Sequence, residues 1–176
     1  MTLTTSRVLR PREQAPDLEL PVVGGGHLRL ADLHPASFTM LVFNRGLHCP
    51  ACQAQLRELD RRLDELTERG IEVVSISAET AERATRMRDE WGIARVPLAY
   101  GLSEEQMREW GLFVSRGVGG DEPPVFNEPA LFLLRPDGTV YYESLLSMPV
   151  GRPRLDDLFG GLDYWSAHDY PARGEA

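Results

Sequence analysis

The sequence contains no lysine: its nineteen Lys or Arg positions are all arginine. Enzymes that form a Schiff base or hold a nucleotide phosphate with a P-loop lysine are therefore excluded. Acidic residues number 27, which leaves a net charge of −8. This charge argues against a nucleic-acid backbone as the main partner.

Long apolar runs are absent as well. No segment approaches the roughly eighteen consecutive apolar residues of a membrane-spanning helix. The first sixteen residues, MTLTTSRVLRPREQAP, lack the apolar region of a secretory signal peptide. We therefore expect a cytoplasmic protein that does not enter a membrane. Permanent structural disulfides are rare in that compartment.

Cysteine is scarce, and the two copies stand close together. Cys49 and Cys52 lie in the stretch NRGLHCPACQ, with two residues between them. Placing two cysteines at random in the chain would give this spacing in roughly one case in a hundred. In a reducing compartment such a pair is more often catalytic or metal-binding than structural.

Length and composition predict one globular domain. The chain has 176 residues, of which 42% are apolar and 26% charged, values typical of a soluble domain with a real core. Residues 1–16 are polar and interrupted by proline, so we expect a flexible N-terminal arm there. The single domain is then expected to span residues 17–176.

The hydrophobic pattern predicts alternating strands and helices. Continuous apolar runs such as FTMLVF are typical of strands buried on both faces, whereas apolar steps of three and four residues indicate helices. We expect strands in 17–30, 38–43, 71–77, 97–100, 130–134 and 139–146, and helices at 50–70, 81–92, 103–110 and 154–164, with a long loop over 114–128. This order predicts a mixed α/β sheet with helices on both faces.

The cysteine pair falls where a strand gives way to a helix. Pro50 suits the first helical position, so Cys49 becomes the N-cap, where unpaired N–H groups and the helix dipole stabilise a thiolate. Arg45 and His48 are expected to add positive charge. Cys52 lies one turn further and begins the apolar stripe of the helix, within disulfide distance. The pattern therefore predicts that Cys49 attacks and Cys52 resolves.

Two other interpretations of the pair remain open. A soft metal such as copper or zinc could be held by Cys49, Cys52 and a histidine. However, a closed zinc site usually has four ligands, and the sequence offers four scattered histidines but no second cysteine pair. The cysteines could also be inert core residues. Dithiol redox chemistry, without a cofactor or metal, is the favoured interpretation.

The segment FNRGLHCPACQAQLREL resembles the active-site region of bacterial peroxiredoxin-like proteins of the alkyl hydroperoxide reductase/thiol-specific antioxidant group. The segments APDLELP, IEVVSISAET, PLAYGLSEEQMREWGL and EPALFLLRPDGTVYY resemble other parts of that group. The resemblance implies a thioredoxin-like fold with a central mixed sheet flanked by helices and an N-terminal hairpin. It also implies a thiol peroxidase or thiol–disulfide oxidoreductase. Such an enzyme reduces a peroxide or a disulfide and is regenerated by a thioredoxin- or glutathione-type reductant.

The resemblance assigns roles to individual residues. Cys49 aligns with the attacking cysteine, and Cys52 occupies the resolving position of thioredoxins. Pro129 falls where thioredoxins carry a cis-proline packed against the disulfide, so we expect a cis peptide bond there; the alternative is an ordinary proline at the start of a strand. The group usually has a Thr or Ser where this chain has Gly46, and an arginine where Pro129 stands. Arg45 and Arg152 are the candidates to replace that arginine, and the sequence indicates no oligomeric state.

Overall fold

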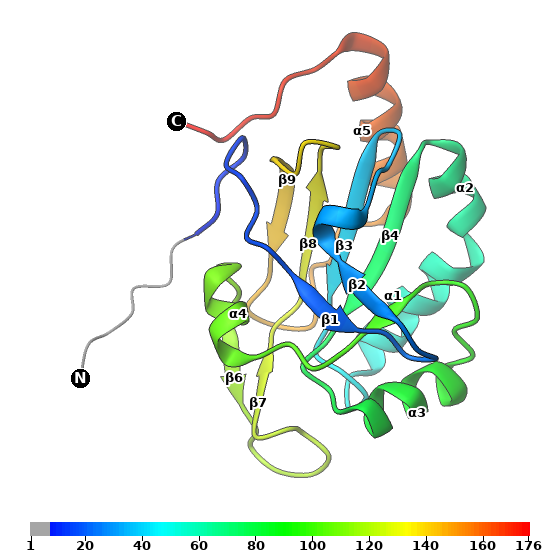
Figure 1. Ribbon diagram of the computed structural model, residues 1–176, viewed down its shortest axis with the longest axis vertical. Helices are drawn as coiled ribbons and strands as arrows, with labels where there is room; N and C mark the ends of the chain where they lie inside the picture. Colours follow the sequence, from blue (N-terminus) through cyan, green and yellow to red (C-terminus); the bar gives the residue numbers. More distant parts are fainter. Residues whose placement is uncertain (1–7) are drawn as a thin grey trace.

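A five-stranded mixed sheet forms the centre of the computed structural model, which describes residues 8–176 (Figure 1). The strand order is β5-β4-β3-β8-β9. The first three strands in this order run parallel, and β8 is antiparallel to both β3 and β9. Their bounds are β3 Phe38–Phe43, β4 Ile71–Ile76, β5 Leu98–Ala99, β8 Ala130–Leu134 and β9 Val140–Leu145.

Helices and a small hairpin cover the two faces of this sheet. One face carries α1 (Pro50–Arg61), α2 (Leu63–Glu68), α3 (Ala81–Trp91) and α5 (Leu155–His168). The other carries α4 (Glu104–Glu109) and the hairpin of β1 (Glu19–Pro21) and β2 (His27–Arg29), which is followed by a short 3-10 turn at Leu30–Asp32. The predicted mixed sheet, flanked by helices and preceded by a hairpin, is confirmed (Figure 1).

The alternation of side chains in β3 separates the core into two layers. Met40 and Val42 pack toward the helices that include α1 and α5, whereas Leu41 and Phe43 face α4 and the hairpin. On the second side, the rings of Phe43, Trp110 and Phe132 pack at centroid distances of 5.3 to 5.8 Å. Because β3 is buried on both faces, its carboxyl end holds the following loop in a fixed position.

Several predicted elements differ in extent. The expected helix over 50–70 is interrupted at Arg62, whose φ of −102° and ψ of 16° lie outside the helical range. The Arg62 guanidinium pairs with Asp156 of α5 at 2.7 Å and lies over the Phe159 ring. The expected loop over 114–128 contains a further hairpin, β6 (Val114–Arg116) and β7 (Val125–Asn127), and α5 extends beyond its predicted end.

The expected arm over 1–16 lies partly outside the described residues, and its remainder is packed rather than loose. Leu9 and Ala15 are buried. The Arg12 N–H donates to the Val140 carbonyl at 2.7 Å, and the Ala15 N–H donates to the Gly138 carbonyl at 3.1 Å. The prolines in this stretch exclude helix, but they leave enough backbone donors to pair beside the β8–β9 turn.

No helix within residues 8–176 is both long and apolar enough to cross a membrane.

Candidate active site

The candidate site lies where β3 ends and α1 begins. Cys49 is the N-cap of α1, with φ −108° and ψ 101°, and Pro50 is the first helical residue. The Cys49 sulfur accepts a hydrogen bond from the Cys52 backbone N–H at 3.2 Å. Both cysteines are free thiols and are buried, with 1% of Cys49 and 0% of Cys52 exposed. The predicted N-cap position is confirmed, and its capping group is the sulfur itself.

The two sulfurs are in direct contact and differ in acidity. The Cys52 thiol donates a hydrogen bond to Cys49 Sγ at 2.6 Å. This bond is the largest influence on the pKa of Cys49 and, with the Cys52 backbone N–H and the positive charge of Arg152, lowers that pKa to about 6 despite burial. Burial, and the hydrogen bond to Cys49, raise the pKa of Cys52. At neutral pH the pair is therefore a Cys49 thiolate beside a Cys52 thiol.

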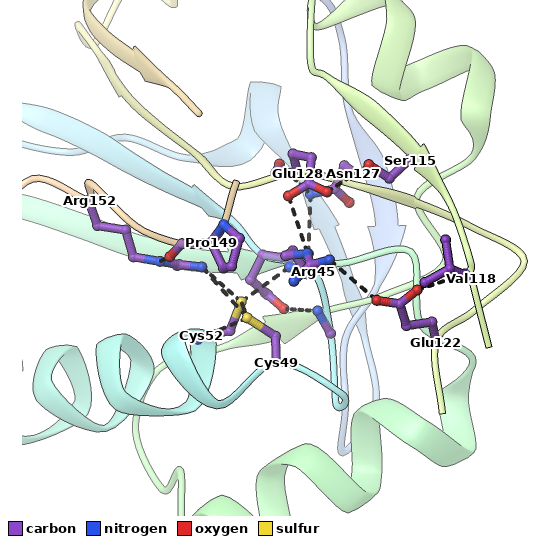
Figure 2. A network of polar contacts seen from close by, with 12 residues as sticks. Arg45, Cys49, Cys52, Ser115, Val118, Glu122, Asn127, Glu128, Pro149 and Arg152 are labelled. Carbon is purple, nitrogen blue, oxygen red and sulfur yellow. Dashed lines mark hydrogen bonds and ion pairs between the residues drawn. The ribbon is translucent and has the colours of Figure 1, made fainter. Parts of the chain in front are cut away.

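Arg152 reaches these sulfurs from the segment between β9 and α5, residues 146–154 (Figure 2). Its Nη2 donates to Cys52 Sγ at 3.0 Å and lies 3.8 Å from Cys49 Sγ. Its Nε donates to the Pro149 carbonyl at 2.8 Å, and its Nη1 donates to Gln55 Oε1. These anchors hold the guanidinium against the sulfur pair. The sequence named Arg152 only as a candidate, because a separation of 100 residues from Cys52 leaves no local pattern.

Arg45 contributes to the site mainly through its backbone. Its N–H donates to Cys52 Sγ at 3.4 Å. Its side chain turns away from the sulfurs, with Nε 3.2 Å from Glu128 Oε2 and Nη2 3.5 Å from Glu122 Oε1 (Figure 2). The guanidinium also lies 4.9 Å from the centre of the Phe126 ring. The Arg45 guanidinium, which the sequence analysis expected beside the thiols, is thus paired with the carboxylates of Glu122 and Glu128 instead.

His48 does not supply the expected positive charge. Its ring packs edge-on against Phe126 at a centroid distance of 4.8 Å. Within residues 8–176, neither ring nitrogen has a hydrogen-bond partner. Burial, together with the charge of Arg45, lowers the pKa of His48. The imidazole is therefore neutral near pH 7, since nothing stabilises its protonated form enough to offset desolvation.

Gly46 leaves no free donor and no room for a hydroxyl side chain. Its φ is +105°, and its N–H donates to Asn44 Oδ1 at 3.0 Å. A Cβ built at this position would lie 2.1 Å from Glu79 Oε1. Glu79 itself is buried, accepts the Leu47 N–H at 2.8 Å and pairs with Arg83 at 2.5 Å. Sequence reasoning missed Glu79, although an acid three residues after the buried strand β4 was a signal.

Pro129 is not a cis-proline, which corrects the expectation from the resemblance. Residues 8–176 contain no cis peptide bond. Pro129 lies between β7 and β8, and its carbonyl accepts the Leu146 N–H at 3.0 Å. Glu128 donates its N–H to the Phe113 carbonyl at 2.8 Å. Pro129 is thus an ordinary proline directly before a strand, a position that does not need the N–H that proline lacks.

The soft-metal interpretation lacks a third ligand. Among residues 8–176, no three His, Cys, Asp or Glu side chains are grouped in a way that could hold a metal ion. The neighbour of Cys49, His48, faces Phe126 instead. The arrangement of the two sulfurs and Arg152 is suited to thiol chemistry, in which a stabilised thiolate and a second thiol meet at one point.

Comparison with known proteins agrees with this chemistry. The model of the AhpC/TSA family matches residues 11–143. A Mycobacterium tuberculosis protein, whose name assigns it provisionally to the peroxiredoxins, is 29% identical over 120 residues, which cover 68% of this chain and 74% of that protein.

Solved structures show the same fold at low identity. A mutant of peroxiredoxin 6 from Arenicola marina superimposes with a TM-score of 0.76 at 16% identity, covering 92% of this chain and 75% of that one. Peroxidoxin BcpB from Mycobacterium tuberculosis has a TM-score of 0.70 at 20% identity, covering 89% and 97%. Mycobacterium tuberculosis AhpC has a TM-score of 0.75 at 15% identity, covering 94% and 98%. The predicted thioredoxin-like fold is confirmed.

Proposed function

The chain belongs to the AhpC/TSA family and is a thiol-dependent peroxidase of the peroxiredoxin type, and we propose that the pair Cys49–Cys52 forms its complete redox centre. The observation that carries the proposal is the 2.6 Å contact between Cys49 Sγ and the Cys52 thiol. It supplies both an activated nucleophile and a second thiol within reach, so one chain contains everything needed for an internal disulfide.

In the first step the Cys49 thiolate attacks one oxygen of a hydroperoxide. A sulfur–oxygen bond forms, the peroxide O–O bond breaks, and Cys49 becomes a sulfenic acid. The departing oxygen takes up a proton and leaves as an alcohol or, from hydrogen peroxide, as water. Arg152 Nη2, which is 3.8 Å from Cys49 Sγ, is the cation nearest to the developing negative charge.

In the second step Cys52 resolves the sulfenic acid. Its sulfur attacks Cys49 Sγ, a disulfide forms, and the hydroxyl leaves as water after taking the Cys52 proton. The two sulfurs are already 2.6 Å apart, so this step needs little movement of α1. Two thiol groups of an external reductant, from one dithiol of the thioredoxin type or from two molecules of a glutathione-type thiol, then return both cysteines to the thiol state and leave as a disulfide.

Burial of the site favours a small oxidising substrate. Only 1% of Cys49 is exposed, and the segment that carries Pro149 and Arg152 lies across the sulfurs (Figure 2). A hydroperoxide needs a small opening of this segment, whereas a protein disulfide needs a much larger one. We therefore favour peroxide over a protein disulfide as the oxidant of Cys49.

Rapid mixing of the reduced protein with hydrogen peroxide, followed by mass spectrometry, tests the proposal. The wild type should lose two hydrogens within the peptide that holds both cysteines. Cys52→Ser should stop at a sulfenic acid on Cys49, and Cys49→Ser should not react. Bridges found only between two chains would refute an internal resolving role for Cys52. An unreactive wild type would refute the peroxidase mechanism.

A further inference from the structure

We propose that Arg152 is a catalytic residue of the reductive half of the cycle, where it stabilises Cys52 Sγ as the leaving thiolate when an external thiol opens the disulfide. This inference rests on the proposed dithiol cycle. It goes beyond that cycle because it determines which sulfur is released and which group receives the charge.

The geometry places the guanidinium closer to the second sulfur than to the first. Nη2 of Arg152 is 3.0 Å from Cys52 Sγ but 3.8 Å from Cys49 Sγ. The other two guanidinium nitrogens are occupied by the Pro149 carbonyl and Gln55 Oε1, so Nη2 is the nitrogen left for sulfur. A planar guanidinium anchored at two nitrogens is a preorganised donor.

Cys52 needs such a donor because of where it lies. Its side chain is fully buried and continues into the apolar stripe of α1 through Leu56 and Leu59. An isolated thiolate at this position would be costly to desolvate, which agrees with the raised pKa of Cys52. Apart from the Cys49 sulfur, the hydrogen-bonding partners of Cys52 Sγ within residues 8–176 are the Arg45 N–H at 3.4 Å and Arg152 Nη2 at 3.0 Å. Of these two donors, Arg152 is the one that carries a positive charge.

The reductive step then runs as follows. A thiolate of the external dithiol attacks Cys49 Sγ at the helix end, and a mixed disulfide forms. The Cys49–Cys52 bond breaks, and its electron pair passes to Cys52 Sγ, where the Arg152 guanidinium offsets the new charge. The second thiol of the reductant gives its proton to Cys52 and attacks the mixed disulfide. The reductant leaves oxidised, and Cys49 returns to the thiolate.

The test isolates this half-reaction. The disulfide is prepared with diamide, without any peroxide, and its reduction by dithiothreitol is followed by stopped flow in the wild type, Arg152→Met and Arg152→Lys. Arg86→Met, which removes an exposed arginine of α3, is the matched control. We expect Arg152→Met to slow reduction about 100-fold, the size typical of one donor at a developing anion. Arg152→Lys should recover at least about tenfold of this loss, because it keeps the charge, and Arg86→Met should stay within about twofold of the wild type.

The oxidation of each reduced variant by hydrogen peroxide supplies the comparison. The proposal requires a larger loss in reduction than in oxidation. It is overturned if Arg152→Met slows oxidation at least as much as reduction, since the residue would then serve Cys49 or only the packing of the segment. It is also overturned if Arg152→Lys reduces no faster than Arg152→Met. A wild type that ignores peroxide but shows the expected reduction pattern would refute the peroxidase mechanism alone.

Discussion

Two segments meet at the sulfurs, and they supply donors in opposite ways. The loop of residues 44–48, next to Cys49 in sequence, gives the sulfurs one backbone donor, the Arg45 N–H. Its other N–H groups bind elsewhere: that of Gly46 binds Asn44, and that of Leu47 binds Glu79. The segment of residues 146–154, far away in sequence, directs the Arg152 guanidinium at both sulfurs. The sequence motif therefore contributes the two thiols, whereas a distant segment contributes the cation that contacts them.

The largest expected consequence concerns the rate of peroxide reduction. The resemblance implies that related enzymes use a Thr or Ser hydroxyl where this chain has Gly46, whose N–H is already bonded. Losing one positioned donor costs about 10²- to 10³-fold. We expect reduced wild type to react with hydrogen peroxide below about 10⁵ M⁻¹s⁻¹. Stopped-flow measurement with hydrogen peroxide and an alkyl hydroperoxide checks this, and a faster reaction would show that the 146–154 segment compensates fully.

Introducing a hydroxyl side chain by Gly46→Thr should destabilise the folded state. The residue has a φ of +105°, and its new Cβ would lie 2.1 Å from Glu79 Oε1. We expect the free energy of unfolding to fall by more than about 3 kcal/mol, measured by urea denaturation. The double variant with Glu79→Ala removes the clash but not the backbone strain. If Gly46→Thr is as stable as the wild type, the loop of residues 44–48 has room for a side chain at position 46, contrary to our expectation.

The acidity of Cys49 should appear as pH-dependent stability. A folded-state pKa of about 6, below the ordinary value of 9.0, means that the thiolate stabilises the fold. This contribution is complete above the unfolded-state pKa and is lost as pH falls through 6. We expect the reduced wild type to gain about 1–3 kcal/mol from pH 6 to 9 relative to Cys49→Ala.

Cys52→Ala is the companion variant for that measurement. It removes the hydrogen bond that is the main cause of the lowered pKa of Cys49, so most of the gain between pH 6 and 9 should disappear. A gain that persists in Cys52→Ala would place the source of the acidity in the helix end or in Arg152 instead.

The smallest expected effect compares the two arginines directly. Arg152 and Arg45 both lower the pKa of Cys49, and Arg152 does so more strongly. Arg152→Met should raise this pKa by less than about one pH unit, and Arg45→Met by less still, because carboxylates already hold the Arg45 side chain. The pH dependence of alkylation by iodoacetamide measures both shifts. A larger shift in Arg45→Met would reverse the roles of the two segments.

Much of the candidate site could be predicted from local sequence pattern. Pro50 after Cys49, and the apolar steps that begin at Cys52, predicted the helix start, the N-cap sulfur and the more buried second sulfur. The continuous apolar runs and the apolar steps of three and four residues likewise predicted most of the strands and helices. These features depend on neighbours within about one helical turn, so sequence order carries them directly.

Other features depended on contacts between distant residues. The neutral state of His48 follows from its burial and from the charge of Arg45. The trans bond at Pro129 is likewise a feature that the sequence did not predict. The pairing of residues 9–15 beside the β8–β9 turn could not be inferred from a proline-rich stretch. Resemblance misled at Pro129 because a matching position does not preserve the surrounding chain.

The sequence by itself determined that this is a mixed α/β protein with one closely spaced cysteine pair, because strand and helix periodicity and the spacing of Cys49 and Cys52 are local properties. Only the tertiary structure decided which arginine side chain contacts those sulfurs. Arg45 and Arg152 carry the same charge, and their surroundings separate them: Glu122 and Glu128 hold the first away from the sulfurs, whereas Pro149 and Gln55 hold the second against them. The strength of a charge at a reacting atom depends on distance and on competing partners, and folding sets both.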